Sequence, residues 1–381
     1  HIPFPSKGLP FDGNGMWIWT LSATERGSLA RIAAKATAND ITTLFIKSSD
    51  SDHLYPRGNA QFTKDLVSYF HSKGLRVCAW PFVYGRLARA EAAMTIEAAK
   101  RGADCIAIDA EGEYEGRYSA ASTYIATVRK AIGTSYPLSL AGLPYVDYHP
   151  SFPFSVFLGR GAAQFNQPQA YWQDIGRSVD TVMSHTWSVN APYGRVIVPL
   201  GQAWAVRHNS ELLRFRSVSA AWGAPGVSWW DWQESRASQW PAFGSALPWP
   251  NTRLSAPEWI HLAYGNKGDL VLWAQQHLIA AGRRIKATGK YDVATRAAVT
   301  AFQGTRGILP TGVIDGSTWR ALLKVQLPLP SWARPKTPSG GTGTPPVNVT
   351  STGRPSSGPS AITGLEGRDE FTARPRGAHH S

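Results

Sequence analysis

The 381-residue sequence lacks several features that would assign it to a particular class of protein. It has no run of about 18 apolar residues, so it predicts no transmembrane helix. It has neither a G-x-G-x-x-G turn after its first predicted strand nor a Walker-type phosphate loop, so nothing supports nucleotide binding. Acidic residues are few, because 39 Lys+Arg stand against 26 Asp+Glu and give a formal net charge of +13. The basic residues form no run typical of a nucleic-acid interface, so we predict no nucleic-acid partner, and the diffuse charge favours other polyanions.

Cysteine is also scarce, since only Cys78 and Cys105 are present. Both fall in consecutive predicted strands, where two small buried thiols are the default interpretation and a disulfide is the alternative. Two cysteines alone do not decide between an oxidising and a reducing compartment. No cluster of Cys and His has the spacing of metal ligands, so we predict no metal site and no cofactor.

What the sequence does contain, over its first 247 residues, is a regular alternation of short apolar runs and helical patterns. The predicted strands are Met16–Leu21, Ile41–Lys47, Leu75–Phe82, a run from Cys105, Pro137–Leu143, Ala162–Asn166, Arg195–Leu200 and Val227–Trp232. The predicted helices between them are 28–39, 59–73, 87–101, 120–132, a weaker 154–158, 175–187 and 211–221. Such alternation implies parallel strands with right-handed crossovers, and its number and length match a (β/α)8 barrel. A doubly wound open sheet is the alternative.

Two acids end the fourth predicted strand, in the sequence Cys105-Ile-Ala-Ile-Asp109-Ala-Glu111-Gly-Glu113. Residues two apart on a strand face the same side, so Asp109 and Glu111 are expected to project together, roughly 6.5–7 Å apart along the backbone. Two neighbouring carboxylates at the end of an apolar strand are costly unless they have a function. The alternative is a cluster of acids that only caps a helix or solvates a loop.

Further polar and aromatic residues lie at or near the other predicted strand ends. Parallel barrels carry their active sites at the carboxyl ends of the strands, so we expect these residues around one rim. Acids and amides bind sugar hydroxyls, and flat rings cover the apolar face of a sugar. We therefore predict a carbohydrate site with Glu111, Asp109 and Asp231 as catalytic residues. The predicted substrate-binding residues are Lys47, Trp80, Tyr84, Tyr145, Gln164, Gln167, Tyr171, Gln202 and Trp229, any one of which alone could instead be structural.

A second module follows a Pro-containing linker, which we place at 248–265. In residues 266–325 the sequence Thr288-Gly-Lys-Tyr-Asp292-x-x-Thr295 is echoed by Thr311-Gly-Val-Ile-Asp315-x-x-Thr318, and helices are expected over 270–280, 294–305 and 317–323. These residues, together with Gly268-Asp269-x-Val271, Val299-x-x-Phe302-Gln303 and Thr318-Trp319-x-x-Leu322, resemble the three-helix peptidoglycan-binding domain. The resemblance implies binding to peptidoglycan. Residues 326–381 are rich in Pro, Gly, Ser and Thr and are expected to form a flexible tail.

The Asp-x-Glu pair on the fourth strand resembles family 25 glycoside hydrolases, which are lysozymes, and more distantly the family 18 chitinase-type barrels. The resemblance implies that Glu111 is the general acid and that Asp109 supports the acetamido group of the substrate. Repulsion between the two acids and partial burial would raise the pKa of one of them. The family 25 acid at the end of strand one is missing, since Asp12 precedes that strand, and Asp231 or Asp147 could take its place. Of two further family 18 acids on strand four, this chain has Asp104 but carries Ala107 at the second position.

These features together predict a secreted, monomeric bacterial enzyme located at the cell wall, although no signal peptide is visible. The barrel would cleave N-acetylhexosamine glycosidic bonds of peptidoglycan, and the second module would anchor it. The alternative is a non-catalytic glycan-binding protein with a degenerate hydrolase barrel.

Overall fold

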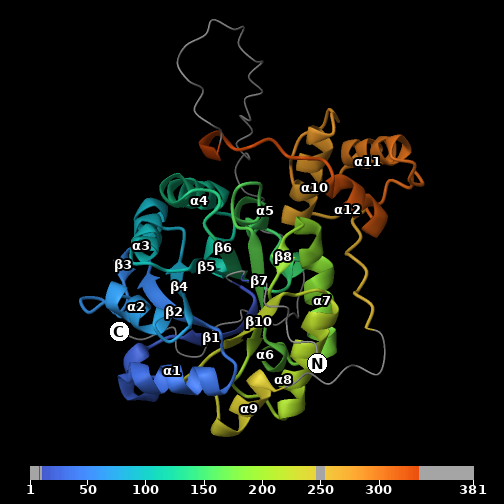
Figure 1. Cartoon of the computed structure of the whole chain (residues 1–381). Coiled ribbons are helices and arrows are strands. Elements are labelled where there is room, and N and C mark those ends of the chain that lie inside the picture. Colours follow the sequence, from blue (N-terminus) through green and yellow to red (C-terminus); the bar gives the residue numbers. More distant parts are fainter. Residues whose placement is uncertain (1–7, 9–10, 246–253, 334–381) are drawn as a thin grey trace, which may run out of the picture.

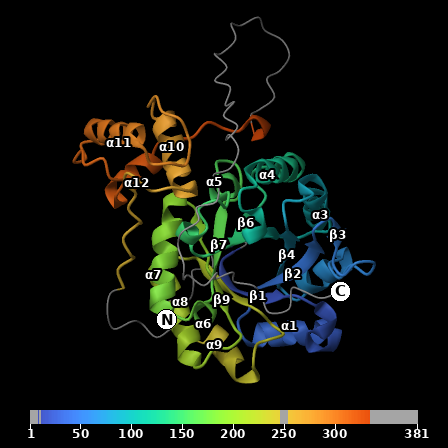
Figure 2. The same ribbon diagram turned by 180° about the vertical axis from the view of Figure 1, so that it is seen from behind.

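The structure, a computed structural model, describes residue 8 and residues 11–245 and 254–333. Its first part is a closed barrel of parallel strands surrounded by helices (Figures 1 and 2). Closure is shown by β1, which pairs in parallel with both β10 and β2, so the open-sheet alternative is wrong. The strands are β1 (Gly13–Ile18), β2 (Thr43–Asp50), β4 (Arg76–Val83), β5 (Cys105–Ala110), β6 (Leu138–Gly142), β7 (Phe165–Ala170), β8 (Val196–Ile197) with β9 (Leu200–Gln202) as two halves of the seventh position, and β10 (Gly226–Trp230). A short β3 (His53–Leu54) folds back on β2.

Both faces of the barrel strands are apolar, as expected for parallel strands buried on two sides. One face packs against the surrounding helices, and the other fills the barrel interior with a cluster that includes Trp17, Phe45, Trp80 and Trp230. Gly15 faces inward on β1, where an added Cβ would lie 2.5 Å from the ring of Phe45. The interior is therefore a packed core in which a glycine makes room for an aromatic ring.

The helices of the barrel follow the predicted order with shifted ends. They are α1 (Leu29–Ala38), α2 (Lys64–His71), α3 (Ala88–Lys100), α4 (Tyr118–Ile132), α5 (Phe154–Phe157), α6 (Trp172–Ile175), α7 (Val179–Asn190), α8 (Asn209–Ala221) and α9 (Trp240–Gly244). The helix predicted from residue 59 begins only at Lys64, because the Thr63 hydroxyl accepts from the backbone N–H of Leu66 and caps it there. Within the described residues no helix combines the length and the apolar character needed to cross a membrane.

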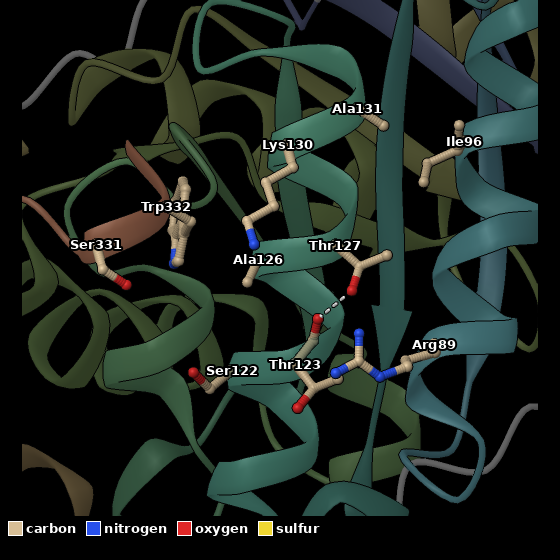
Figure 3. Close-up of a pocket in the computed structure, with 10 residues that line it drawn as sticks. All are labelled: Arg89, Ile96, Ser122, Thr123, Ala126, Thr127, Lys130, Ala131, Ser331 and Trp332. Carbon is tan, nitrogen blue, oxygen red and sulfur yellow. Dashed lines mark hydrogen bonds between the residues drawn. The ribbon is translucent and has the colours of Figure 1, made fainter. Parts of the chain in front are cut away.

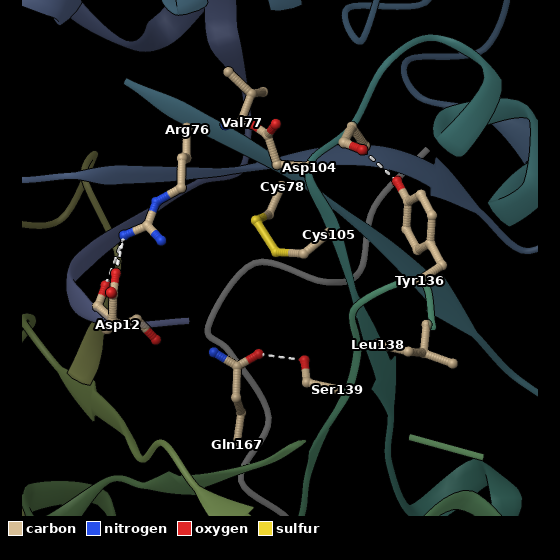
Figure 4. The surroundings of a disulfide bond; sticks show 12 residues. Asp12, Arg76, Val77, Cys78, Asp104, Cys105, Tyr136, Leu138, Ser139 and Gln167 are labelled. Atoms are coloured by element: carbon tan, nitrogen blue, oxygen red, sulfur yellow. Dashed lines mark hydrogen bonds and ion pairs between the residues drawn. A yellow bond between two sulfur atoms is a disulfide. The ribbon is translucent and has the colours of Figure 1, made fainter. Parts of the chain in front are cut away.

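The two cysteines form a disulfide inside the barrel (Figure 4). Cys78 on β4 and Cys105 on β5 are partners in the strand register, and their Cα atoms lie 4.6 Å apart. This distance lies within the range that a disulfide spans, so the interpretation as two free thiols is wrong. The bond joins residues 27 positions apart, a loop that the chain-entropy account associates with about 3–4 kcal/mol of stabilisation.

The second module consists of α10 (Asp269–Ala280), α11 (Val293–Thr305) and α12 (Gly316–Leu323), close to the predicted helices. Its internal repeat is structural. The Asp292 carboxylate accepts from the N–H of Thr295 at 2.8 Å, and Asp315 accepts from that of Thr318 at the same distance. These bonds cap α11 and α12, as the repeated motif predicts.

A glutamine supports each turn of this repeat from the preceding helix. Gln275 accepts from the backbone N–H of Gly289 at 2.8 Å, and Gln303 accepts from that of Gly312 at 2.9 Å. The side-chain amides of Gln275 and Gln303 donate to the threonine hydroxyls that follow each capping aspartate, at 2.9 and 3.0 Å. The two halves of the module are thus built by the same network of hydrogen bonds.

The module is docked on the barrel and contacts it directly. The barrel helix α5 is only one turn long, and α10 packs beside it near α7 (Figure 1). Asp269, the first residue of α10, is buried and accepts from Ser155 N and Oγ at 2.8 and 2.6 Å, Tyr193 at 2.7 Å and Tyr118 at 2.9 Å. The indole of Trp273 donates to the carbonyl of Pro192 at 2.7 Å. The first helix of the module is therefore anchored to the barrel through its first residue, Asp269, and through Trp273.

The segment after α12 returns to the barrel. Arg160 donates to the carbonyl of Leu327, and Trp332 packs against the hydrophobic core that contains α4. Residues 326–333, which the composition places in the tail, therefore lie on the barrel wall. The rest of the predicted tail, residues 334–381, lies outside the described residues, as do residues 248–253 of the predicted linker.

Candidate active site

Asp109 and Glu111 lie side by side at the carboxyl end of β5, as their spacing predicts. Only 3% of Asp109 and 6% of Glu111 is exposed. The side-chain amide of Gln169, from β7, donates to Asp109 Oδ1 at 3.2 Å and to Glu111 Oε1 at 3.0 Å. Both carboxylates therefore converge on one amide group inside the barrel rim.

The pKa of Asp109 is raised well above its usual value. Burial is the main cause, and the negative charge of Glu111 adds to it, while the charge of Lys47 opposes it. A hydrogen bond between the two carboxyl groups acts in the same direction as burial, because it needs a proton on Asp109. The pair therefore retains a proton to a higher pH than an isolated aspartate would.

Lys47 lies on the β2 side of the same rim and is almost fully buried. Its ammonium group donates to Asp50 Oδ2 at 2.7 Å and lies 4.6 and 5.0 Å from the ring centres of Tyr55 and Trp80. Asp50 in turn accepts from the hydroxyl of Tyr84 at 3.0 Å. The direct partner of Lys47 is thus Asp50, and its effect on Asp109 is exerted across the interior.

Asp231 and Tyr171 complete the group of predicted residues that the structure brings together. Tyr171 is buried, and its pKa is raised by burial and then by the charges of Asp109, Glu111, Asp231 and Asp174. Asp231 follows β10, accepts from the N–H of Glu234 at 3.1 Å, and has its pKa raised to about 7 by burial. The rim therefore holds two carboxyl groups whose pKa values lie above the normal aspartate range.

Aromatic rings form the layer beneath the acids. The ring centres of Trp17 and Trp80 are 5.5 Å apart, and those of Trp80 and Trp230 are 5.3 Å apart. Three partly buried rings pack on this cluster from the residues that follow strands β1, β4 and β9, namely Trp19, Tyr84 and Trp204. The acids therefore lie among aromatic side chains at the carboxyl ends of the strands.

Two predicted substrate-binding residues lie on the outside of the barrel. Trp229 points to the helix layer, with its ring centre 5.2 Å from that of Phe215 and 5.0 Å from that of Phe243. Tyr145 packs edge-to-face on His185 of α7, at 4.3 Å. Neither belongs to the rim group, and for β10 the inward-facing residue is the next one, Trp230.

Three predicted glutamines are also absent from this group. Gln164 precedes β7 and accepts from Arg129 at 2.7 Å, at the opposite end of the strand. Gln167 faces the interior at a deeper level, where it accepts from Ser139 near the disulfide (Figure 4). Gln202 accepts from the N–H of Gln173 at 2.7 Å and so stabilises the loop after β7.

The other acids considered from the sequence have local partners away from Asp109. Asp12 forms an ion pair with Arg76 at the start of β4. Asp104 pairs with His71 at 2.8 Å, and Asp147 pairs with His185 at 2.9 Å. Of the candidates for the missing strand-one acid, only Asp231 lies in the group around Tyr171.

Sequence reasoning missed Gln169, the residue that joins the two acids. The predicted strand 162–166 was placed too early, because Pro168 and the amides weaken the strand signal. The observed β7 spans Phe165–Ala170, and inward positions continue at alternate residues to Tyr171. Extending the two-residue alternation through the proline would have placed Gln169 beside Asp109.

A comparison with protein-family models finds one match. Residues 267–322 match the family described as "Putative peptidoglycan binding domain". This segment belongs to that domain family. No curated protein matches the chain.

Similar solved structures include two chitinases and a mannanase. A chitinase from Chromobacterium violaceum ATCC 12472 has 13% identity and a TM-score of 0.45, with 61% of this chain and 98% of that chain covered. A class V chitinase from Pseudomonas fluorescens Pf-5 has 12% identity and a TM-score of 0.46, with 60% and 98% covered. An endo-beta-1,4-mannanase from Thermotoga petrophila has 10% identity and a TM-score of 0.44, with 60% and 69% covered. Likeness at this level carries no argument about the reaction or the substrate of this chain.

The peptidoglycan-binding domain has a surface groove of its own, about 380 Å³ in volume. It lies between residues 264–267 and the start of α11, and it is lined by Tyr264, Lys267 and Lys290 among others. Tyr264 is 61% exposed and Val293 is 69% exposed, both high values for large apolar side chains. Exposed rings and unburied cations suit a ligand that offers both sugar faces and carboxylates. In the described part of the chain, no group of three or more His, Cys, Asp or Glu is arranged to hold a metal ion.

Proposed function

We propose that the barrel hydrolyses glycosidic bonds of N-acetylhexosamine units in peptidoglycan, and that its peptidoglycan-binding domain holds the protein on the wall. The observation that carries this proposal is the convergence of Asp109 and Glu111 on the amide of Gln169 at the carboxyl ends of the barrel strands. Glycoside hydrolysis needs a carboxylic acid that protonates the leaving oxygen and a second group that stabilises the cationic centre. A carboxyl pair whose Asp109 has a pKa raised well above the usual value retains a proton more readily than an isolated acid, which suits the first need.

We assign Glu111 as the general acid and Asp109 as its partner. Glu111 comes after the last residue of β5, nearer the rim, and it is the more exposed of the two. Asp109, with its raised pKa, shares a proton with Glu111 in the free protein. Transfer of the shared proton from Asp109 to Glu111 makes Glu111 the acid that protonates the leaving oxygen. The same transfer leaves Asp109 as a carboxylate that can accept a hydrogen bond from the acetamido N–H of a bound sugar. Asp231, whose charge also raises the pKa of Tyr171, is the third acid that we place at the reacting sugar.

The disulfide and the C-terminal domain support a location outside the cytoplasm. Disulfides persist in oxidising compartments, and peptidoglycan lies there as well. We therefore propose that the protein acts as a secreted or wall-associated protein, and that its ligand is the insoluble wall polymer.

A second candidate is a barrel that binds glycan without cleaving it. The observation that favours it is the low exposure of the two acids, 3% and 6%, since a general acid must reach the leaving oxygen. Under this alternative Asp109 and Glu111 would have a structural role inside the barrel and would not protonate a substrate.

Purified protein incubated with peptidoglycan separates the two candidates. Release of new reducing ends by the wild type, and its loss in Glu111→Gln with an unchanged melting temperature, supports hydrolysis. Glu113→Gln is the matched control, because Glu113 lies on the following turn and is only partly buried. Equal release by wild type and Glu111→Gln, or no release by either, removes the enzyme assignment.

Retention on insoluble peptidoglycan tests the domain. Deleting the domain would expose the barrel face that α10 covers, so point variants are the better probe. Tyr264→Ala in the groove is expected to weaken retention severalfold, while Leu309→Ala, at a residue that is 77% exposed outside the groove, is expected to leave it unchanged.

A further inference from the structure

A second groove, about 550 Å³ in volume, lies on the outer helix layer of the barrel (Figure 3). Its walls are α3 and α4, and Trp332 and Ser331 close it from the segment that returns from the peptidoglycan-binding domain. A volume of this size is within the range of ligand-binding pockets. None of the residues that line it belongs to the candidate active site, so it is a separate feature of the surface.

The groove carries two cations without nearby acids. Arg89, at the start of α3, and Lys130, in the last turn of α4, both line it and extend toward its centre (Figure 3). In the described part of the chain neither side chain forms an ion pair. The sequence of α4 contains no Asp or Glu at all. The groove is therefore positively charged in a protein whose formal net charge is already +13.

The acids of α3 are engaged elsewhere and do not neutralise these cations. Glu91 is buried and accepts from the backbone N–H of Gly85 at 3.0 Å. Glu97 pairs with Arg101 on its own helix at 2.9 Å. The charge of the groove is thus available to a ligand.

The remaining walls suit a sugar. Trp332 presents an indole beside Lys130, and α4 contributes the hydroxyls of Ser122, Thr123 and Thr127 (Figure 3). The Thr127 hydroxyl donates to the carbonyl of Thr123 at 2.7 Å, so its lone pairs can accept from a ligand hydroxyl. The seven steps along α4 from Thr123 to Lys130 span about 10 Å, which is longer than a single anionic group.

We propose that this groove binds an acidic segment of a wall polysaccharide, with Arg89 and Lys130 holding its anionic oxygens and Trp332 stacking on a sugar ring. Charge complementarity selects an acidic occupant, and the indole with the hydroxyls selects a carbohydrate. The inference rests on the proposed wall location but not on catalysis. It gives the protein a wall contact in addition to the groove of the peptidoglycan-binding domain.

Binding of the full-length chain to purified walls at low salt tests the proposal. The variant Arg89→Gln/Lys130→Gln is expected to weaken retention on the order of tenfold, the size expected for losing two exposed ionic contacts. Arg31→Gln/Lys64→Gln removes the same types of charge from exposed positions on α1 and α2 and is the matched control. Adding Trp332→Ala to the double variant is expected to weaken retention further. Trp332→Phe in the otherwise wild-type chain is expected to keep most of the retention, because it keeps an aromatic ring.

Two chemical treatments of the wall identify the source of the anion. Hydrofluoric acid removes phosphodiester-linked polymers, and carbodiimide amidation neutralises the carboxylates of the peptide stems. Whichever treatment abolishes the difference between wild type and Arg89→Gln/Lys130→Gln identifies the ligand as a phosphate or a carboxylate. The proposal is overturned by equal retention of the two proteins on untreated walls, by an equal loss in the control variant, or by a wild type that does not bind walls.

The proposed hydrolase activity can fail without affecting this result. If the wild type releases no reducing ends but Arg89→Gln/Lys130→Gln still reduces retention, the groove is a binding site on a non-catalytic protein. If reducing ends are released and the double variant is retained as well as the wild type, the hydrolase assignment is supported and the proposal that the groove binds a wall polysaccharide is wrong.

Discussion

Two of the buried carboxylate sites among the described residues, the domain interface and the barrel rim, treat their charges in opposite ways. At the interface with the peptidoglycan-binding domain, Asp269 receives four hydrogen bonds from Ser155, Tyr193 and Tyr118, and burial raises its pKa to about 6 against the opposing effect of those bonds. At the barrel rim, Asp109 and Glu111 share one amide group, and their mutual repulsion adds to the effect of burial. The first arrangement satisfies a charge, whereas the second places two charges where they oppose each other. We infer that the interface serves stability and the rim serves chemistry.

The largest expected effect is on the activity of rim variants. Glu111→Gln removes the proposed acid, and a positioned general acid typically contributes about 10²–10⁴-fold to a rate, so kcat should fall by about that factor. Asp109→Asn should also lower kcat, yet it should raise the melting temperature, because an amide removes the buried repulsion. Kinetics on peptidoglycan and thermal unfolding of both variants check this. A rim variant that loses stability and keeps its activity would show that these acids stabilise the fold, as Asp269 does at the interface, and do not take part in the reaction.

The next effect concerns the interface. Asp269→Ala leaves the N–H of Ser155 and the hydroxyls of Tyr118 and Tyr193 without their acceptor, which should cost roughly 2–4 kcal/mol of unfolding free energy. Denaturant unfolding followed by tryptophan fluorescence measures it. Asp292→Ala, which removes an exposed helix cap inside the domain, is the control and should cost about 1 kcal/mol. A smaller loss at Asp269 than at Asp292 would show that docking contributes little.

The pH dependence of stability follows from the same interface. The pKa of Asp269 in the folded protein is about 6, above the value of 3.8 for an ordinary aspartate. A carboxyl group whose pKa is raised on folding stabilises the fold fully below its unfolded pKa, and this contribution is lost as the pH rises through the folded pKa. Stability should therefore fall between about pH 4 and pH 7, by an amount on the order of 1–3 kcal/mol for this group.

Asp231, with a pKa of about 7, contributes to stability with the same sign and extends the loss toward neutral pH. Unfolding free energies measured from pH 4 to pH 8 check both groups. Asp269→Asn should flatten the lower part of the curve and Asp231→Asn the upper part. A stability that rises over this range in the wild type would contradict the raised pKa values.

The sequence was sufficient for the closed barrel and the three-helix module, because both depend on periodic patterns. It failed where one residue of register decides the outcome. Trp229 and Trp230 are neighbours, but a shift of one position on a strand exchanges the inner and outer faces. Trp229, the predicted residue, faces the helices, and Trp230 faces the barrel interior. The sequence places Cys78 and Cys105 in consecutive strands, but the disulfide also depends on the register that sets them opposite each other, which the pattern does not contain.

The interface itself could not be predicted for a different reason. It joins two parts of the chain that lie far apart in the sequence, the one-turn helix α5 of the barrel and the module's first helix α10. Asp269 was visible only as part of a family motif at a helix start. Its burial and its four partners come from Tyr118, Ser155 and Tyr193, which lie 76 to 151 positions away in the chain. Contacts of this range require the fold to be known first.

The smallest expected effect tests the amide that joins the two acids. Gln169→Ala removes the shared donor while leaving both carboxylates, so repulsion between them grows and the pair holds its proton to higher pH. The pH optimum of activity should move upward, and kcat at its optimum should fall by roughly tenfold, since the two hydrogen bonds from one amide group to the acids are lost. Gln167→Ala, one inward position deeper on the same strand, is the matched control and should leave the pH profile in place. A change in kcat without a shift in the pH profile would mean that Gln169 only fills space. The raised pKa at the rim would then be caused by burial, which also raises the pKa of Asp269. The two carboxylate sites would then differ only in that the charge of Glu111 adds to the effect of burial at the rim.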